Sequence, residues 1–177
     1  MFVAFREAAI EMWGESGLQT LARALPEDAR IATVDNLVVS VGLYPERYTV
    51  AWFNVAYSVM SRRLDREFYS FLDSMMDHGF GRVRRALLRL ATPGFLLDQA
   101  ASLWRHDHSH GTLEVEVGRG IGKLVLKDHD YVWDTVSRAA LAEIFRYGVT
   151  LTGAQQVTAS HAMLDPNVLS VTLRWRA

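Results

Sequence analysis

The chain has 177 residues, and half of them are hydrophobic, which is enough to bury a core and argues against disorder. Its formal net charge of −1 gives no overall attraction to nucleic acid or to anionic lipid, so we expect neither as a partner. The absence of cysteine excludes disulfides, thiolate zinc sites, iron–sulfur clusters and cysteine nucleophiles.

The N-terminal segment becomes charged at Arg6 and lacks a basic leader followed by an apolar stretch, so we expect no signal peptide. No apolar run approaches the ~20 residues that a membrane-spanning helix needs. We therefore expect a cytoplasmic protein without membrane insertion.

The first 105 residues are predicted to be mainly helical, because their apolar residues recur at steps of three and four. Gly14 interrupts the first of these stretches. Pro26 should end the helix that precedes it, and Pro45 suits the first turn of the next. β-branched side chains leave a strand as an alternative to a helix for residues 37–41.

The sequence Asp77-His78-Gly79 is typical of a helix C-terminus with glycine in the left-handed conformation. We therefore expect one helix to end there and another to cover residues 81–91. Thr92 can cap the helix after that, and Pro93 suits its first turn.

From residue 113 the apolar period changes from 3.6 to 2. Residues 113–117 and 121–127 alternate apolar and polar side chains, and Gly118-Arg119-Gly120 suits a hairpin connection between them. A helix is predicted over residues 131–147, with Gly148 at its end.

Two further strands close the sequence. The last has the clearest alternation, with Leu169, Val171, Leu173 and Trp175 on one face. The turn Asp165-Pro166-Asn167 joins it to the strand before. The order strand–strand–helix–strand–strand therefore predicts an antiparallel sheet that is buried on one face.

These elements predict an α+β fold, in which an N-terminal helical segment packs on a C-terminal four-stranded antiparallel sheet of ββαββ order. We expect a single domain over residues 1–177. Residues 1–105 form its mainly helical part, and residues 111–177 form its ββαββ part.

Three histidines at alternate positions, His106, His108 and His110, follow the helical part. In an extended chain they would point the same way, and two such imidazoles can bind one metal ion. A divalent metal site is therefore one hypothesis for this segment. A solvated connection between helix and strand is the competing interpretation.

His78 stands at the predicted helix end, where it is a candidate heme ligand or a partner of the helix dipole. His129, between Asp128 and Asp130, suggests a loop and a helix cap.

No nucleophile elbow, phosphate loop or dinucleotide-binding motif is present. The glycines at 118, 120 and 122 lie between two strands, which is the wrong context for phosphate binding. The paired carboxylates Glu114 and Glu116 project from the solvent-exposed face of a predicted strand. We therefore expect no catalytic residues and no enzymatic activity.

Several short motifs carry a family resemblance that extends over most of the chain. They are Tyr44-Pro45, Gly79-Phe80-Gly81, Thr92-Pro93-Gly94-Phe95-Leu96-Leu97, Leu113-Glu114-Val115-Glu116, the passage from Tyr147-Gly148 to Gly153, and Leu173-Arg174-Trp175. With them the sequence resembles an uncharacterised family of bacterial proteins found chiefly in myxobacteria. The order of its elements is also similar to that of the heme-NO-binding, 4-vinyl-reductase-type and TRAPP-like domains.

That wider group holds a small apolar molecule or heme, or mediates assembly, and passes a signal to partners. This sequence departs from the heme binders because it has no Tyr-x-Ser-x-Arg motif for the heme propionates. It also lacks the cysteines common in vinyl-reductase-type domains. The resemblance therefore implies the architecture rather than one activity.

We expect a non-enzymatic cytoplasmic sensor or adaptor domain in signalling, which binds a small apolar ligand or a protein partner and needs no cofactor. The alternatives are a heme- or metal-based gas or redox sensor and an uncharacterised enzyme. Homodimerisation is a further expectation. The predicted ligand pocket is aromatic and thioether-rich, although the same side chains could simply fill the core. Its candidate residues are Trp52, Phe53, Phe68, Phe71, Met75, Phe95 and Trp104.

Overall fold

The computed structural model describes residues 1–36 and 44–176, with the backbone alone for residues 81–85. The chain forms two compact units, Met1–Gly81 and Arg82–Ala177, and each is described by itself. The alternative strand considered for residues 37–41 lies outside the described residues.

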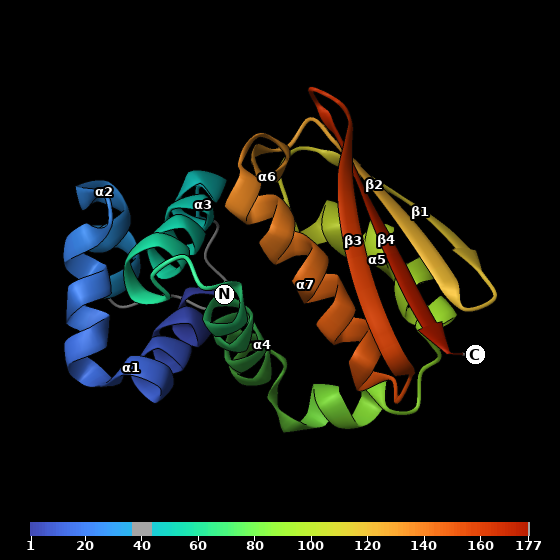
Figure 1. The fold of residues 1–177 in the computed structure, drawn as a ribbon, viewed down its shortest axis with the longest axis horizontal. Coiled ribbons are helices and arrows are strands. Elements are labelled where there is room, and N and C mark those ends of the chain that lie inside the picture. The colour runs from blue at the N-terminus through green and yellow to red at the C-terminus, as the bar shows by residue number, and fades with distance from the viewer. Residues whose placement is uncertain (37–43, 177) are drawn as a thin grey trace. The chain divides into compact units, whose positions relative to one another are not determined.

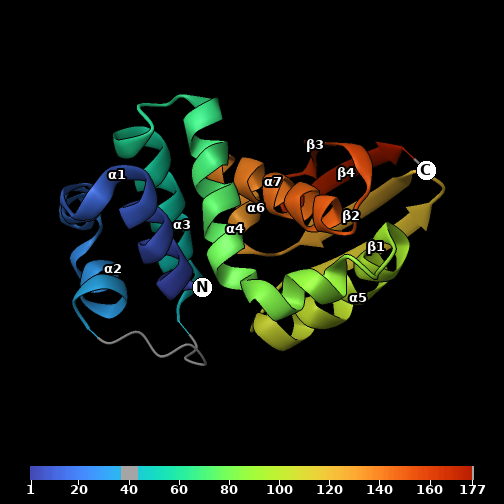
Figure 2. The same cartoon turned by 90° about the horizontal axis from the view of Figure 1, so that it is seen from below.

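The first unit is built from helices alone in its described residues (Figures 1 and 2). They are α1 (Phe2–Ala24), α2 (Glu27–Arg30), the π-helix η1 (Ile31–Asp35), α3 (Glu46–Val55), the π-helix η2 (Ala56–Met60) and α4 (Asp65–Leu88), which continues into the second unit.

The predicted helix boundaries near glycine and proline are largely confirmed in the first unit. Gly14 kinks α1, where its φ of 69° takes the backbone out of the helical region. Helix α1 ends two residues before Pro26, and Pro45 directly precedes α3. Proline and glycine act locally. Proline lacks the backbone N–H donor, and glycine permits a positive φ that other residues avoid.

The predicted helix end at Asp77-His78-Gly79 is wrong, because α4 runs without interruption from Asp65 to Leu88. Gly79 packs against α1, where a Cβ added to it would lie 3.7 Å from the Cβ of Ala4. His78 beside it bonds to a carboxylate of α1. The helix thus continues through Gly79 despite the roughly 1 kcal/mol that glycine costs inside a helix.

The second unit confirms the predicted α+β fold and its ββαββ order (Figure 1). All neighbouring strands are antiparallel, and their order in the sheet is β1-β2-β4-β3. The elements are α5 (Pro93–Asp107), β1 (Thr112–Gly118), β2 (Ile121–Lys127), α6 (Asp130–Trp133), α7 (Thr135–Leu151), β3 (Gln155–Asp165) and β4 (Val168–Arg176).

The register of the sheet places its apolar side chains in rows across one face. Leu126 pairs with Leu113 on one side and with Leu169 on the other, and all three are buried. The hairpin between β1 and β2 turns through Arg119 and Gly120, where Gly120 has a φ of 70°. The alternation read from the sequence therefore identifies the buried face correctly.

Helices α5 and α7 cover the buried face of this sheet. Helix α5 contacts β1, and its Leu97 packs so closely on Gly122 of β2 that a Cβ there would collide with it. Helix α7 contacts β3 and β4. The predicted packing of helix on sheet is thus confirmed for α5.

Two details of the predicted helix 131–147 are wrong. Asp134 divides it into α6 and α7, because its carboxylate accepts a hydrogen bond of 2.7 Å from the amide of Ser137 and caps α7. Gly148 lies inside α7 rather than at its end, and a Cβ added to it would make an ordinary contact with Leu96 of α5, 3.7 Å away. None of the described helices is long and apolar enough to cross a membrane.

Candidate functional site

Five of the seven predicted pocket residues come together in the core of the first unit. They are Trp52, Phe53, Phe68, Phe71 and Met75, each between 0 and 3% exposed. Phe5 of α1 lies among them, with its ring centroid 5.1 Å from that of Trp52, 5.5 Å from that of Phe53 and 6.0 Å from that of Phe71. These rings contact one another directly, and their role in lining a ligand pocket stays a prediction.

The one polar atom of Trp52 is satisfied inside this core. Its Nε1–H donates a hydrogen bond of 2.8 Å to the hydroxyl of Thr33, which in turn donates one of 2.7 Å to the carbonyl of Ala29. Trp52 and Thr33 are both fully buried. The indole is therefore fixed at both ends, by ring contacts and by this bond.

The other two predicted pocket residues, Phe95 and Trp104, belong to the second unit. Phe95 is 60% exposed at the start of α5, and Trp104 is buried further along the same helix. The indole of Trp104 stacks on the ring of His108, with centroids 3.8 Å apart. The seven residues are thus found in three different surroundings.

His78 lies on α4 between two carboxylates of α1. Its Nε2 is 3.1 Å from Oε2 of Glu11, and its Nδ1 is 3.4 Å from Oε2 of Glu7. Ser74 donates a further hydrogen bond of 2.5 Å to Glu11. The bonds from Ser74 and His78 lower the pKa of Glu11 below its ordinary value, so this carboxylate stays charged. A carboxylate held against one nitrogen of a histidine is the arrangement that supports metal-binding imidazoles.

The predicted metal-binding segment is not extended throughout. His106 belongs to α5, which ends at Asp107, whereas His108 and His110 lie in the connection to β1. The rings of these two histidines contact His129, which the sequence places at a helix cap. That cap is confirmed, because His129 directly precedes α6 and its Nδ1 accepts a hydrogen bond of 3.3 Å from the amide of Tyr131.

The contacts of His129 define a cluster of three histidines in the second unit, which we call the histidine cluster: His108, His110 and His129. The rings of His110 and His129 stack with centroids 4.6 Å apart and an interplanar angle of 14°. His108 meets His129 edge-on at 5.2 Å. His129 is fully buried, while His110 is exposed.

The sequence interpretation missed His129 as a member of this cluster. The signal lies in the hairpin: Thr112 pairs with Lys127, so the residues just before β1 and just after β2 must meet. A short hairpin connection fixes this pairing, because register follows from turn length.

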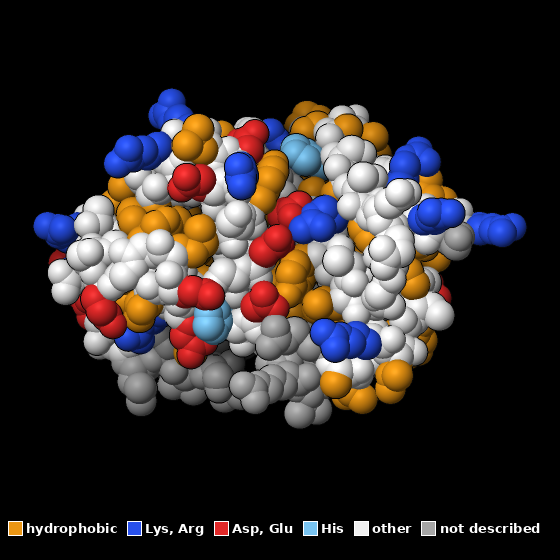
Figure 3. Space-filling model, turned by 60° about the horizontal axis from the view of Figure 1, so that its bottom comes forward, with side chains coloured by type: hydrophobic (Ala, Val, Ile, Leu, Met, Phe, Trp, Pro, Cys, Tyr) orange, Lys and Arg blue, Asp and Glu red, His pale blue; other side chains and the backbone are white. Residues whose placement is uncertain are grey.

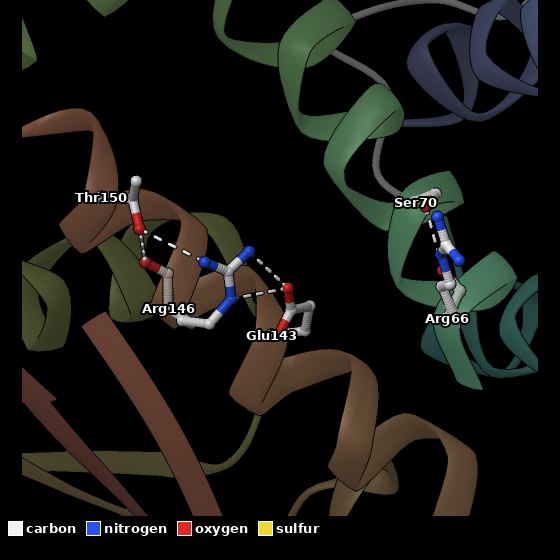
Figure 4. Close-up of polar contacts among 5 residues, drawn as sticks. All are labelled: Arg66, Ser70, Glu143, Arg146 and Thr150. Carbon is white, nitrogen blue, oxygen red and sulfur yellow. Dashed lines mark hydrogen bonds and ion pairs between the residues drawn. The ribbon is translucent and has the colours of Figure 1, made fainter. Parts of the chain in front are cut away.

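Helix α7 carries a polar contact of a different kind (Figure 4). The guanidinium of Arg146 bonds to the carboxylate of Glu143 through Nε at 2.6 Å and Nη2 at 2.5 Å, and Nη1 lies 3.4 Å from the hydroxyl of Thr150. This arginine is half-buried and held by its own helix. It is thus a fixed positive group that is already matched by a carboxylate.

Figure 3 shows one face of the molecule, on which the Lys and Arg side chains are spread out rather than gathered in one patch. A surface for nucleic acid would need such a patch. On this face, the distribution of charge agrees with the near-zero net charge of the chain.

Comparison with known proteins gives no match by sequence. No protein-family model matches the chain, and no curated protein matches it.

The match comes from solved structures, which show that the chain has the H-NOX fold. The Fe(II) unliganded H-NOX protein from K. algicida aligns with a TM-score of 0.69 at 9% identity, over 99% of this chain and 95% of that chain. An H-NOX protein from S. oneidensis in the Fe(II)NO ligation state aligns with a TM-score of 0.71 at 10% identity, over 99% and 97%. Of the three folds in the sequence resemblance, the heme-NO-binding one is supported, and these comparisons support neither of the others.

The expectation that the chain needs no cofactor is wrong in the light of these neighbours. They are H-NOX proteins in Fe(II) and Fe(II)NO states. A further neighbour, with a TM-score of 0.64 at 7% identity over 99% of this chain and 93% of that chain, concerns the control of heme redox potential by porphyrin distortion. These neighbours therefore point to heme rather than to the absence of a cofactor.

The residues of this chain meet the demands of heme in part. His78 offers an imidazole, both of whose ring nitrogens lie against carboxylates of α1, those of Glu7 and Glu11. The Tyr-x-Ser-x-Arg motif for the propionates is absent from the sequence. The imidazole is thus the type of ligand that heme iron takes, and it would have to give up one of these contacts to bind, while the propionates would need contacts other than that motif.

Proposed function

We propose that this chain is a non-enzymatic sensor domain that binds heme and, through it, a small gas molecule. The observation that carries the proposal is the likeness to H-NOX proteins over 99% of the chain, with TM-scores of 0.69 and 0.71. A match over the full length of an α+β fold supports the same use of the fold better than a match over one motif. At 9–10% identity the likeness concerns the backbone, so the role of each residue rests on its own contacts in this chain.

His78 is the residue that we propose as the iron ligand. When bound, heme would supply an iron centre that takes a diatomic gas as a ligand. One ring nitrogen of His78 would face the iron, and the other would keep its bond to a carboxylate of α1. Glu11 is suited to that second role, because its lowered pKa keeps it charged and able to accept.

Heme binding is tested by adding hemin to the purified chain and recording the absorption spectrum. We expect a Soret band distinct from that of free hemin, and a shift of this band when the reduced protein is exposed to NO or CO. His78→Ala should abolish or displace the band. His161→Ala is the matched control, since it removes a histidine of β3, and it should leave the band unchanged.

Two results would count against the proposal. Absence of any protein-specific Soret band would remove heme binding, and with it the gas sensor. A band that is the same in the wild-type chain and in His78→Ala would leave heme in place but remove His78 as its ligand.

A further inference from the structure

We propose that the histidine cluster of the second unit binds one divalent transition-metal ion, independently of heme. Its three imidazoles approach from two connections of the chain, at the end of α5 and at the start of α6. Imidazole nitrogen suits zinc, nickel and copper, whereas calcium and magnesium prefer oxygen ligands. A set of three histidines also leaves a position on the metal for a further ligand.

His108 and His129 each bring a ring nitrogen near the other. In a tetrahedral site, zinc–nitrogen bonds of about 2.0–2.1 Å place two ligand nitrogens about 3.3 Å apart. One ring nitrogen of His108 and one of His129 lie within 4.8 Å of each other. Both side chains must therefore turn toward each other to bring these nitrogens onto one ion.

His110 has a neighbour that can orient it as the third ligand. Its Nε2 lies 3.6 Å from Oδ1 of Asp130, and its Nδ1 lies 3.4 Å from the hydroxyl of Ser109. A histidine that binds metal through one nitrogen usually donates the other to a carboxylate or another acceptor. Asp130 can take that role, and Nδ1 of His110 would then reach the ion once this ring turns out of its stack on His129.

The surroundings hold the cluster in place. Trp104 stacks on His108, which limits the directions in which that ring can turn. Gly111 has a φ of 78°, and a Cβ there would come within 2.9 Å of the His129 ring. Only glycine combines this backbone angle with so close an approach, so the connection is shaped around His129.

Metal binding would change one hydrogen bond in a predictable way. Nδ1 of His129 accepts from the amide of Tyr131. Ligation at Nδ1 would replace this bond, and ligation at Nε2 would move the ring proton to Nδ1 and end its role as an acceptor. The amide of Tyr131 therefore loses this bond to Nδ1 in either case.

The test uses Co²⁺ as the probe, added to the full heme-free chain and followed by its visible absorption, with Zn²⁺ as the competitor. We expect one ion per chain, displaced by Zn²⁺, and a shift of the Tyr131 amide resonance on binding. His108→Ala and His110→Ala should each weaken binding at least tenfold. His129 is buried, so His129→Gln is used only if its circular dichroism matches that of the wild type.

His106→Ala and His161→Ala are the matched controls, because each removes one histidine outside the cluster. Both should bind Co²⁺ as the wild type does. Binding that survives His108→Ala combined with His110→Ala, equal loss in a control, or no stoichiometric uptake would each overturn the proposed site. Because no heme is added, none of these outcomes depends on the proposed gas sensor.

Discussion

The two ring clusters of this protein are held by the same kind of ring contact and differ in chemistry. In the first unit, phenyl and indole rings meet at centroid distances of 5–6 Å and are almost wholly removed from water. In the second unit, three imidazoles meet at similar distances and keep an exposed edge. The ring contacts of the first unit thus bury apolar area, whereas those of the second unit bring nitrogen donors together.

This contrast teaches that packing and function can use the same geometry. A phenyl ring stabilises the fold through the apolar area that it removes from water, so its loss should lower the free energy of unfolding. An imidazole has less apolar area and carries two nitrogen donors, so its loss should weaken metal binding more than it lowers the free energy of unfolding. Substitutions in the two clusters should therefore produce different kinds of effect.

The largest effect is expected for Phe71→Ala in the first unit. Phe71 is fully buried and stacks on Trp13 at 4.9 Å and on Phe5 at 6.0 Å, so its removal leaves a cavity. The free energy of unfolding should fall by about 3–5 kcal/mol, measured by urea denaturation.

Phe95→Ala is the matched control for that loss, since the same side chain is 60% exposed there. It should change the free energy of unfolding by less than about 0.5 kcal/mol. Similar losses at the two positions would mean that the aromatic cluster is not a packed core. His110→Ala, in the other cluster, should also have a small effect on stability.

The sequence was sufficient to predict the sheet and its buried face, because a period of 2 is a local signal. The pairs Leu113–Leu126 and Leu126–Leu169 follow from it once the hairpin and the last turn are placed. The helix end predicted at Gly79 is wrong, because α4 continues to Leu88 and its His78 bonds to Glu11 of α1, which lies far from it in the sequence.

The candidate sites were harder to predict for the same reason. The sequence singled out His108 and His110, but it grouped them with His106, which the structure places inside α5. His129 joins them only through the hairpin register. The carboxylates beside His78 lie on α1, more than sixty residues earlier in the chain, and no local pattern connects them.

A smaller effect than that of Phe71 is expected for Trp52→Phe, which keeps a ring in the core and removes its donor. The hydroxyl of Thr33 would lose the bond from Nε1 while staying buried. The free energy of unfolding should fall by about 1–3 kcal/mol in urea denaturation. The combined change with Thr33→Val should be less than the sum of the two single changes, because both remove the same bond. Strict additivity would contradict a coupled pair.

In the second unit, Asp134→Ala should cost about 1 kcal/mol, because it removes the acceptor that caps α7. Thr92→Ala makes the same kind of change at α5, where the threonine hydroxyl accepts from the amide of Phe95 at 3.2 Å. Because the hydrogen bond at Thr92 is longer, Thr92→Ala should lower the free energy of unfolding less than Asp134→Ala does. Urea denaturation of both variants gives the order, and a larger loss for Thr92→Ala would reverse our interpretation of the caps.

The smallest effect is expected at the surface of the first unit, where Glu11 meets Ser74 and His78. The bond from Ser74, followed by that from His78, holds the pKa of Glu11 below its ordinary value of 4.5. A carboxyl whose pKa is lowered on folding adds stability above its unfolded pKa and loses it as the pH falls through the folded one. The melting temperature of the wild type should therefore fall more steeply than that of Glu11→Gln as the pH drops below 4.5. Ser74→Ala keeps the carboxyl but removes its first partner, so its profile should lie between the other two. Parallel profiles for all three proteins would show that these contacts do not stabilise the charged form of Glu11.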